Sequence, residues 1–344
     1  MKKDIKDLNL DELKQYFLSI NEPEYRANEL FHAVYREKKE NFNDITTLPK
    51  SLRKTLSNTF YIYSFKIISK YESKKDGSIK YLFQLSDKCL VETVFMHESN
   101  QYGKMRNTLC ISSSIGCPLG CKFCATGQMG LLRNLTTGEI IEQFMQIDKI
   151  TKINNVVFMG MGEPLLNYDN VKKAIEVLSD GNGRALGKRK IVISTSGIPG
   201  KIYQLTDQIS SARLAISLHA GEQSKRDFLM PGLKDHTLIE LRKAINYYTR
   251  KIGNTITIEY LLLKEVNDTI SDVQSLVDFL KKLNFVKVNL IRYNPVPHVK
   301  FKVSKKENMF LRSLQKNGIR ATLRKSKGPD ISAACGQLAT KLRK

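Results

Sequence analysis

The sequence predicts an α/β fold, a partial (β/α)6 barrel that follows an N-terminal helical segment and a β-hairpin linker. Six short apolar runs after residue 105 alternate with helix-like stretches, which is typical of parallel strands joined by crossover helices. Glycine, serine, histidine and asparagine motifs directly follow these runs, where the active sites of such folds lie. The runs are residues 109–111, 156–159, 191–193, 214–216, 256–258 and 286–291.

Residues 1–60 are expected to form a helical accessory domain. Asp11 is expected to cap a helix that carries apolar residues at helical spacing from Leu13 onward. An apolar stripe over residues 25–35 predicts a second helix, and Pro49 opens a third.

Residues 61–104 alternate between apolar and polar side chains, and residues 74–77 (Lys-Lys-Asp-Gly) are typical of a turn. We therefore expect a β-hairpin linker here. Residues 105–344 are expected to form the main domain. Within it, Thr136 and Glu139 form a capping box that opens the first crossover helix.

The 344 residues include 56 Lys and Arg against 34 Asp and Glu, which gives a net charge of +22. A globular protein this basic is a candidate nucleic-acid binder, because neutralising phosphates releases condensed counterions. A lysine-rich surface that is merely solvated is the alternative. The candidate phosphate contacts are Lys104, Arg106, Arg133, Lys188, Arg189, Lys190, Arg320, Arg324, Lys325 and Lys327.

The first residues, Met-Lys-Lys-Asp-Ile-Lys-Asp, lack the apolar segment of a signal peptide. The longest apolar runs are too short to span a membrane. We therefore expect a cytoplasmic protein without a membrane partner. In that compartment the six cysteines are expected to be reduced thiols.

Three cysteines, Cys117, Cys121 and Cys124, lie in one short loop with the spacing Cys-x3-Cys-x2-Cys. Thiolates this close together usually hold a metal or an iron–sulfur cluster. A four-iron cluster held by three of them keeps one iron open for another ligand, as catalytic metal sites do. A zinc site is the alternative, and its fourth ligand would be His97, His219 or a distant cysteine.

Four long motifs occur along the chain, at residues 117–130, 158–165, 194–197 and 334–338. They contain Cys-Pro-Leu-Gly-Cys-Lys-Phe-Cys, Phe-Met-Gly-Met-Gly-Glu-Pro-Leu, Ser-Thr-Ser-Gly and Ala-Cys-Gly-Gln-Leu. With these motifs the chain resembles the RlmN/Cfr family of radical S-adenosylmethionine (SAM) RNA adenosine methyltransferases over residues 21–338. The resemblance implies a radical SAM barrel as the catalytic domain.

The resemblance also implies a [4Fe–4S] cluster on the three loop cysteines and two molecules of SAM per turnover. Gly160 and Gly162 let the backbone approach a ligand closely, and Glu163 suits the methionyl ammonium group of SAM. An ordinary turn after a strand is the alternative. Gly162 and Glu163 are accordingly assigned to SAM. The further implied SAM contacts, whose alternatives are turn caps and satisfied polar groups, are Ser194, Ser217, Leu218, His219 and Asn294.

Two distant cysteines receive catalytic roles from the resemblance. It implies that Cys335 takes a methyl group from one SAM, and that a radical from a second SAM activates this methyl for addition to adenine. Cys110 then releases the methylated base, which leaves a Cys110–Cys335 disulfide. Glu92 matches a family position assigned as proton acceptor, although a strand glutamate is more often solvated. Cys89 matches no role and is expected to be structural.

The resemblance implies that RNA is the substrate. The helical domain of residues 1–60 is a candidate contact for this RNA, and scaffolding is its alternative role. The RlmN type methylates C2 of an adenosine in 23S rRNA and in some tRNAs, whereas the Cfr type methylates C8 of the same rRNA adenosine and confers antibiotic resistance. Pro164, Gln128 and Met129 favour C2, whereas Arg292 and residues 231–232 depart from that pattern. A flavodoxin is expected as the electron donor, and the protein is expected to be a monomer.

Two interpretations from other functional classes stay open. A radical enzyme that activates a partner protein would share the cluster, but would need neither Cys110 nor Cys335. A zinc-bearing RNA-binding module without catalysis would be colourless, whereas an iron–sulfur protein is brown and absorbs near about 400 nm.

Overall fold

Seven parallel strands form the part of the sheet that positions the site in this computed structural model, which describes residues 2–99, 103, 105–209 and 212–339. Lys104, a candidate phosphate contact, lies outside these residues. Six of the strands coincide with the predicted apolar runs. The strands are β6 (Met105–Ile111), β9 (Asn155–Phe158), β10 (Ile191–Thr195), β11 (Arg213–Ser217), β12 (Ile256–Leu262), β13 (Val286–Arg292) and β14 (Ala321–Arg324).

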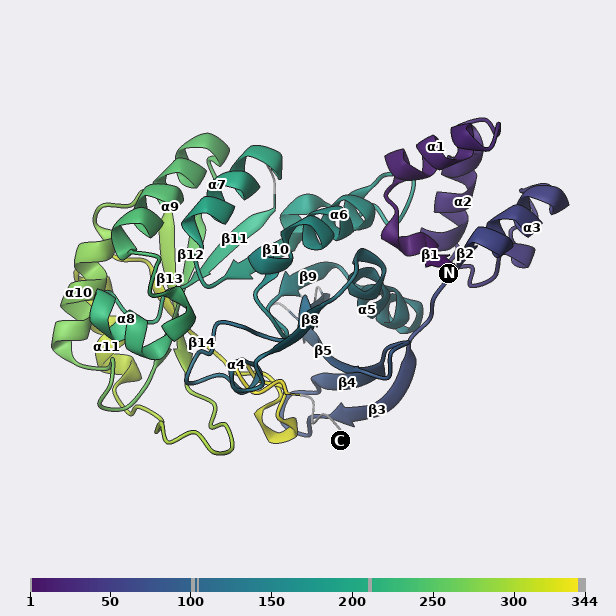
Figure 1. Cartoon of the computed structure of the whole chain (residues 1–344). Helices are drawn as coiled ribbons and strands as arrows, with labels where there is room; N and C mark the ends of the chain where they lie inside the picture. Colours follow the sequence, from purple (N-terminus) through teal and green to yellow (C-terminus); the bar gives the residue numbers. More distant parts are fainter. Residues whose placement is uncertain (1, 100–102, 104, 210–211, 340–344) are drawn as a thin grey trace.

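Helices follow the parallel strands and cover the outer side of the curved sheet (Figure 1). The apolar faces of these helices and the strands between them form most of the hydrophobic core. The predicted capping box is present at the first of these helices. The side chain of Thr136 accepts the backbone N–H of Glu139, and the side chain of Glu139 accepts that of Thr136. The helices are α5 (Thr137–Ile150), α6 (Tyr168–Ser179), α7 (Pro199–Gln208), α9 (Leu238–Ile252), α10 (Ile270–Leu280) and α11 (Glu307–Lys316).

The predicted hairpins continue the same sheet in antiparallel fashion. Their strands are β3 (Lys66–Glu72), β4 (Ile79–Gln84) and β5 (Leu90–Ser99). The complete order is β14-β13-β12-β11-β10-β9-β6-β5-β4-β3, which leaves β14 and β3 as the edges of an open sheet. Lys327, just after β14, lies 3.0 Å from Glu98 of β5, so the sheet curls back toward itself. The predicted partial barrel is therefore confirmed.

Three helices precede the sheet, α1 (Leu10–Ser19), α2 (Tyr25–Tyr35) and α3 (Lys50–Thr59). The cap of α1 is Asn9, which forms a capping box with Glu12, so the prediction of Asp11 as the cap is wrong. Asp11 occupies the first turn instead, where a carboxylate suits the positive end of the helix dipole.

The helical bundle is attached to the main sheet through α5. The ammonium of Lys6 donates to the Glu142 carboxylate, and both side chains are almost fully buried. The backbone N–H of Gly138 donates to Asp7 over 2.8 Å. Among the described residues, no helix is long and apolar enough to cross a membrane. The division into segments 1–60, 61–104 and 105–344 stays a prediction.

Candidate active site

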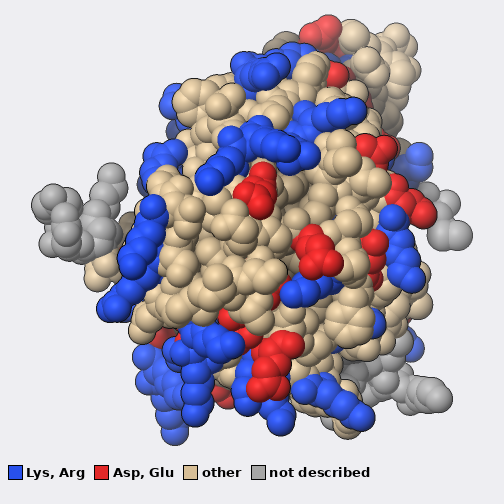
Figure 2. Space-filling model, turned by 90° about the vertical axis from the view of Figure 1, so that its left-hand side faces the viewer, with Lys and Arg blue, Asp and Glu red and all other residues tan. Residues whose placement is uncertain are grey.

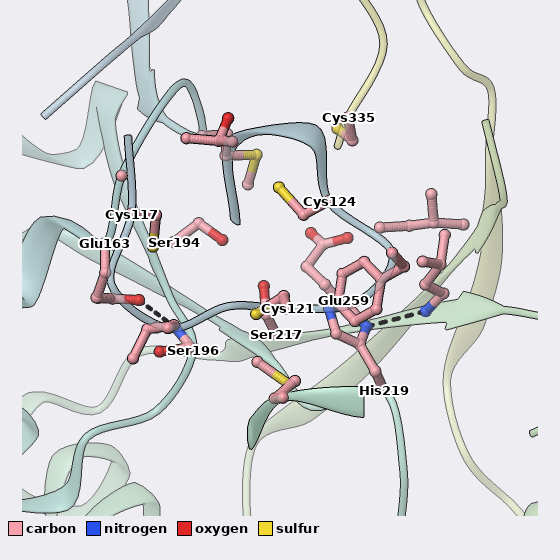
Figure 3. A pocket seen from close by; sticks show the side chains of 18 of the residues that line it. Cys117, Cys121, Cys124, Glu163, Ser194, Ser196, Ser217, His219, Glu259 and Cys335 are labelled. Atoms are coloured by element: carbon pink, nitrogen blue, oxygen red, sulfur yellow. Dashed lines mark hydrogen bonds between the residues drawn. The ribbon is translucent and has the colours of Figure 1, made fainter. Parts of the chain in front are cut away.

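The three-cysteine loop follows β6 and lies between short elements that hold its ends. These elements are β7 (Ser114–Gly116), α4 (Ala125–Gln128) and β8 (Leu131–Asn134). The backbone N–H of Cys117 donates to Gly130 over 2.8 Å, and that of Cys124 donates to Cys121 over 3.1 Å. All three cysteines line one cavity of about 930 Å³ at the carboxyl ends of the strands, the cofactor cavity (Figure 3).

The chemistry of these thiols fits a multinuclear cluster better than a single ion. Burial raises the pKa of all three, to about 12 for Cys117, so positive metal centres would be needed to hold them as thiolates. A zinc ion would need its ligands within about 2.3 Å of one point. In the described parts of the chain, no three Cys, His, Asp or Glu side chains are arranged to hold one ion.

Gly162 lies shortly after β9 and lines the cofactor cavity, where its lack of a side chain leaves room for a ligand. Its φ of +97° lies in the left-handed region, which side chains with a Cβ rarely adopt. A Cβ built there would lie 2.0 Å from the Ser114 hydroxyl oxygen and 2.8 Å from that of Ser113. A side chain at this position would therefore force the side chains of Ser113 and Ser114, which lead into the cysteine loop, to move.

The carboxylate of Glu163 is buried in the cofactor cavity and held in one orientation. One oxygen accepts the backbone N–H of Ser196 over 2.7 Å, and the other accepts that of Leu165 over 3.0 Å. Burial raises the pKa of Glu163, and the bond from Ser196 offsets part of this rise. A cationic group of a ligand would compensate the desolvation of this carboxylate.

The cavity brings together three of the remaining predicted SAM contacts, Ser194, Ser217 and His219. His219 has a φ of 60°, a strained conformation that is often found at functional sites. Its Nδ1 atom accepts the backbone N–H of Leu261 over 3.1 Å. Burial and the neighbouring Arg226 lower the pKa of His219 to about 3, so the ring is neutral at physiological pH.

Two predicted SAM contacts lie elsewhere. The side chain of Leu218 is fully buried in the core, and only its backbone faces β12, where its N–H donates to Glu259 over 3.0 Å. Asn294 is buried beside the C-terminal segment, and its amide lies 3.4 Å from the carbonyl oxygen of Cys335. It lines a neighbouring cavity rather than the cofactor cavity.

Cys110 and Cys335 both line this second cavity, the thiol cavity, of about 490 Å³. Cys335 also lines the cofactor cavity, so it connects the two, and Figure 3 shows it on the side where Cys124 lies. Burial, and then the nearby Cys335 thiol, raise the pKa of Cys110 to about 12. Cys110 therefore holds its proton at neutral pH until a base removes it.

The antiparallel extension of the sheet holds the segment that carries Cys335. Asp330 accepts from the Ser73 hydroxyl over 2.7 Å and from the backbone N–H of Lys74 over 3.1 Å. Deeper in the molecule, Lys80 donates to the carbonyl oxygen of Ser332 over 3.2 Å. On the other side, the Thr126 hydroxyl of α4 donates to Leu338 over 2.6 Å. The thiol therefore sits on a segment that is fixed from two directions.

Glu92 is a further residue that holds the C-terminal segment, and it lines neither cavity. We call the residues that hold this segment the anchor. It is buried, contrary to the expectation for a lone strand glutamate, and its carboxylate lies 2.9 Å from the Lys80 ammonium. The same carboxylate accepts the backbone N–H of Ala339 over 2.9 Å. The structure thus places Glu92 against the C-terminal segment, and its role as proton acceptor stays a prediction.

Comparisons with known proteins identify the family. A radical SAM superfamily model matches residues 111–280, and a model of the ribosomal RNA large subunit methyltransferase N-terminal domain matches residues 3–62. A probable dual-specificity RNA methyltransferase RlmN from Thermotoga neapolitana is 44% identical over 342 residues, 98% of each chain. The corresponding protein from Christiangramia forsetii is 38% identical and covers 99% of this chain and 97% of its own.

The chain belongs to the RlmN family. A crystal structure of a radical SAM methyltransferase from Sphaerobacter thermophilus has the RlmN-type fold found here, with a TM-score of 0.90 and 36% sequence identity. The superposition covers 97% of this chain and 98% of the Sphaerobacter protein. The resemblance inferred from the motifs is therefore confirmed.

Three site residues of this RlmN family member were not predicted for the site. Arg324, expected as a surface phosphate contact, instead lines both cavities, 3.8 Å from the Glu259 carboxylate. Glu259 shares the inner face of β12 with Thr257 and Leu261, and a charge in such an apolar strand was the available indication. Arg226 of α8 (Gln223–Leu229) is fully buried and donates to the Ser196 carbonyl, which no sequence pattern indicated.

Replacing Gly162 with alanine should destabilise the fold and prevent SAM binding. The strained φ alone costs about 1–3 kcal/mol, and the contact with Ser114 adds to this cost. Thermal unfolding and equilibrium dialysis with SAM measure the two effects. The control is Gly200→Ala in α7, where a Cβ meets no atom within 4 Å and alanine favours the helix. Equal unfolding temperatures for the two variants would contradict the prediction.

Replacing Asp330 with alanine should loosen the segment that carries Cys335. Since Ser73 and Lys74 would lose their common acceptor, we expect alkylation of Cys335 by iodoacetamide to accelerate at least roughly threefold. Peptide mapping by mass spectrometry separates this thiol from the other cysteines. Asp235→Ala, which removes an exposed carboxylate far from the segment in sequence, should react at the parental rate. An unchanged rate for Asp330→Ala would show that the anchor does not restrain the thiol.

Proposed function

We propose that this chain methylates C2 of an adenosine in 23S rRNA and of an adenosine in tRNAs, with Cys335 as the methyl carrier and Cys110 as the resolving thiol. The observation that carries the proposal is the thiol cavity, which Cys110 and Cys335 share and which joins the cofactor cavity at Cys335. The names of the relatives, dual-specificity RNA methyltransferases, support two kinds of RNA substrate.

The proposed cofactors are a [4Fe–4S] cluster on Cys117, Cys121 and Cys124, and two molecules of SAM per turnover. When bound, this pair supplies one-electron chemistry that activates an otherwise inert methyl group. Glu163 would bind the methionyl ammonium, because its buried carboxylate lies in the same cavity as the cysteines. Gly162, Ser194, Ser217 and His219 line the same cavity and would supply further contacts to SAM. Contacts from Leu218 and Asn294, which do not line it, stay predictions.

A protein thiol as carrier answers a chemical difficulty of the reaction. C2 of adenine is not nucleophilic, so direct displacement on the SAM methyl group does not take place there. Cys335 divides the transfer into steps, first onto sulfur and then onto carbon. Cys110 then attacks the sulfur of Cys335 and frees the base, as in thiol–disulfide exchange. The buried guanidinium of Arg324 lines the cavity that both sulfurs share, and its charge offsets part of the rise in the pKa of Cys110.

The regiochemistry is proposed as C2 because the two departures from the RlmN pattern have local structural explanations. Arg292 points away from both cavities and donates to Glu307 of α11 over 2.7 Å. Gly232 lies against the cysteine loop, where its N–H donates to Leu119 over 2.9 Å. A Cβ at this glycine would lie 2.6 Å from the Leu119 backbone. Methylation at C8 is the second candidate.

RNA binding is supported by the net charge of +22. On the face that forms the left side of Figure 1, Lys and Arg side chains are spread out with Asp and Glu side chains among them (Figure 2). We further propose a flavodoxin as electron donor and a monomeric enzyme.

The test is mass spectrometry of adenosines from 23S rRNA and tRNA of a strain that lacks the gene. We expect 2-methyladenosine to disappear and to return on complementation. Appearance of 8-methyladenosine on expression would favour the second candidate. Unchanged 2-methyladenosine in the deletion strain would contradict the proposal, as would a colourless, zinc-containing purified protein.

A further inference from the structure

A third cavity, of about 1380 Å³, lies on the inner face of the curved sheet and has no role in the proposed function so far. We call it the inner hollow. It shares Met159, Glu259 and Arg324 with the cofactor cavity, so the two spaces adjoin at these side chains. It extends toward the amino ends of the strands, because Arg213 is the first residue of β11 and Lys287 the second of β13.

Cations dominate the walls of the inner hollow. Its acidic residues are Glu98 and Glu259, and two cations face them: Lys327 lies 3.0 Å from Glu98, and Arg324 lies 3.8 Å from Glu259. The other four have no carboxylate within 4 Å among the residues that the structure describes. The full set is Arg106, Arg213, Lys287, Arg324, Lys325 and Lys327.

The unpaired cations stand close enough to affect one another. Burial and then the charge of Arg213 lower the pKa of Lys287; Glu259 offsets part of this effect, and Arg106 adds to it. Since six cations share this cavity with two carboxylates, an anion that entered would be bound favourably. The hollow also contains polar groups, since Thr322 donates to Asn289 over 2.9 Å.

We infer that the inner hollow holds the phosphate backbone of the substrate RNA beside the target adenosine. The inference rests on the proposed function and adds the direction from which RNA reaches the active site. RNA would enter at the amino ends of the strands, and the target base would pass Met159 and Arg324 to reach Cys335. SAM would occupy the carboxyl ends, so that the two substrates approach the thiol from opposite ends of the strands.

A nucleic acid strand fits this hollow better than an acidic protein does. The cations line a concave space on the inner face of the sheet, which suits a thin, flexible single strand better than the convex surface of a folded protein. A target base that leaves its stack exposes the flanking phosphates as a flexible strand of this kind. An electron donor would instead need to approach the cysteine loop at the opposite ends of the strands.

The test compares two double variants that each remove two positive charges, at different places in the fold. Arg213→Gln with Lys287→Gln neutralises the inner hollow, whereas Arg250→Gln with Lys282→Gln neutralises exposed cations on the outer helical layer. Affinity for an unmodified transcript of 23S rRNA is measured by filter binding across a salt series. Reductive SAM cleavage without RNA reports whether each variant keeps its cofactor site, and Lys287→Arg tests whether charge alone matters.

We expect the inner variant to bind the transcript at least roughly tenfold more weakly. Its log–log salt slope should fall by about 1.4, since each contact to a single-strand phosphate contributes roughly 0.7. SAM cleavage by this variant, and RNA binding by the outer variant and Lys287→Arg, should stay at the parental level. A parental salt slope for the inner variant would overturn the inference alone. A parent chain that cleaves SAM but neither binds nor methylates RNA would overturn the proposed function as well.

Discussion

Replacing Cys335 with alanine should abolish RNA methylation, with a loss of at least about a thousandfold. The variant lacks the sulfur that would carry the methyl group, and no other cysteine shares both cavities with it among the described residues. Iron content and SAM binding should persist, because the ligands proposed for the cluster and SAM belong to other segments. Methylation is measured by transfer of labelled methyl groups from SAM to an rRNA transcript.

Cys89→Ala is the matched control for this experiment. Cys89 is a partly buried cysteine that lines neither cavity, so its loss should leave methylation within about twofold of the parent. Methyl transfer by Cys335→Ala at a parental rate would mean that the methyl group reaches RNA without this thiol. That result would remove the basis for the carrier mechanism.

Replacing Cys124 with alanine should eliminate both the cluster and all SAM cleavage. Its thiol is one of three that line the cofactor cavity, and the two that remain cannot retain a four-iron cluster firmly. The brown colour and the absorbance near about 400 nm should be lost. RNA methylation should fall by at least about a thousandfold. Cys124→Ser should behave similarly, because a hydroxyl is a poor ligand for iron, while Cys89→Ala should stay brown. A Cys124→Ala protein with parental iron content would contradict the assignment of the loop.

The sequence predicted the parallel strands well because buried strands consist of continuous apolar runs, and six such runs were present. β14 was missed because its four residues, Ala-Thr-Leu-Arg, are too few and too mixed to show a period. This omission explains why the burial of Arg324 between the cavities was not predicted. β14, which was not predicted, places the Arg324 guanidinium on the inner face of the sheet. A run of basic residues in the sequence indicates only a solvated surface.

The site was predicted in unequal parts. The cysteine loop was recognisable from local spacing, but the proximity of Cys110 and Cys335 came from family resemblance, because no local pattern connects residues so far apart in the chain. The burial of Glu92 was unpredictable for a similar reason. Its partners Lys80 and Ala339 come from another strand and from the C-terminal segment, and only the folded sheet brings them together.

The most direct test of the carrier mechanism is mass spectrometry of the Cys110→Ala variant after incubation with RNA, SAM and reductant. Without the resolving thiol, the reaction should stop after the carbon bond forms. We therefore predict a covalent adduct in which one carbon links the sulfur of Cys335 to the adenine ring. Free protein together with normal yields of 2-methyladenosine would contradict the mechanism.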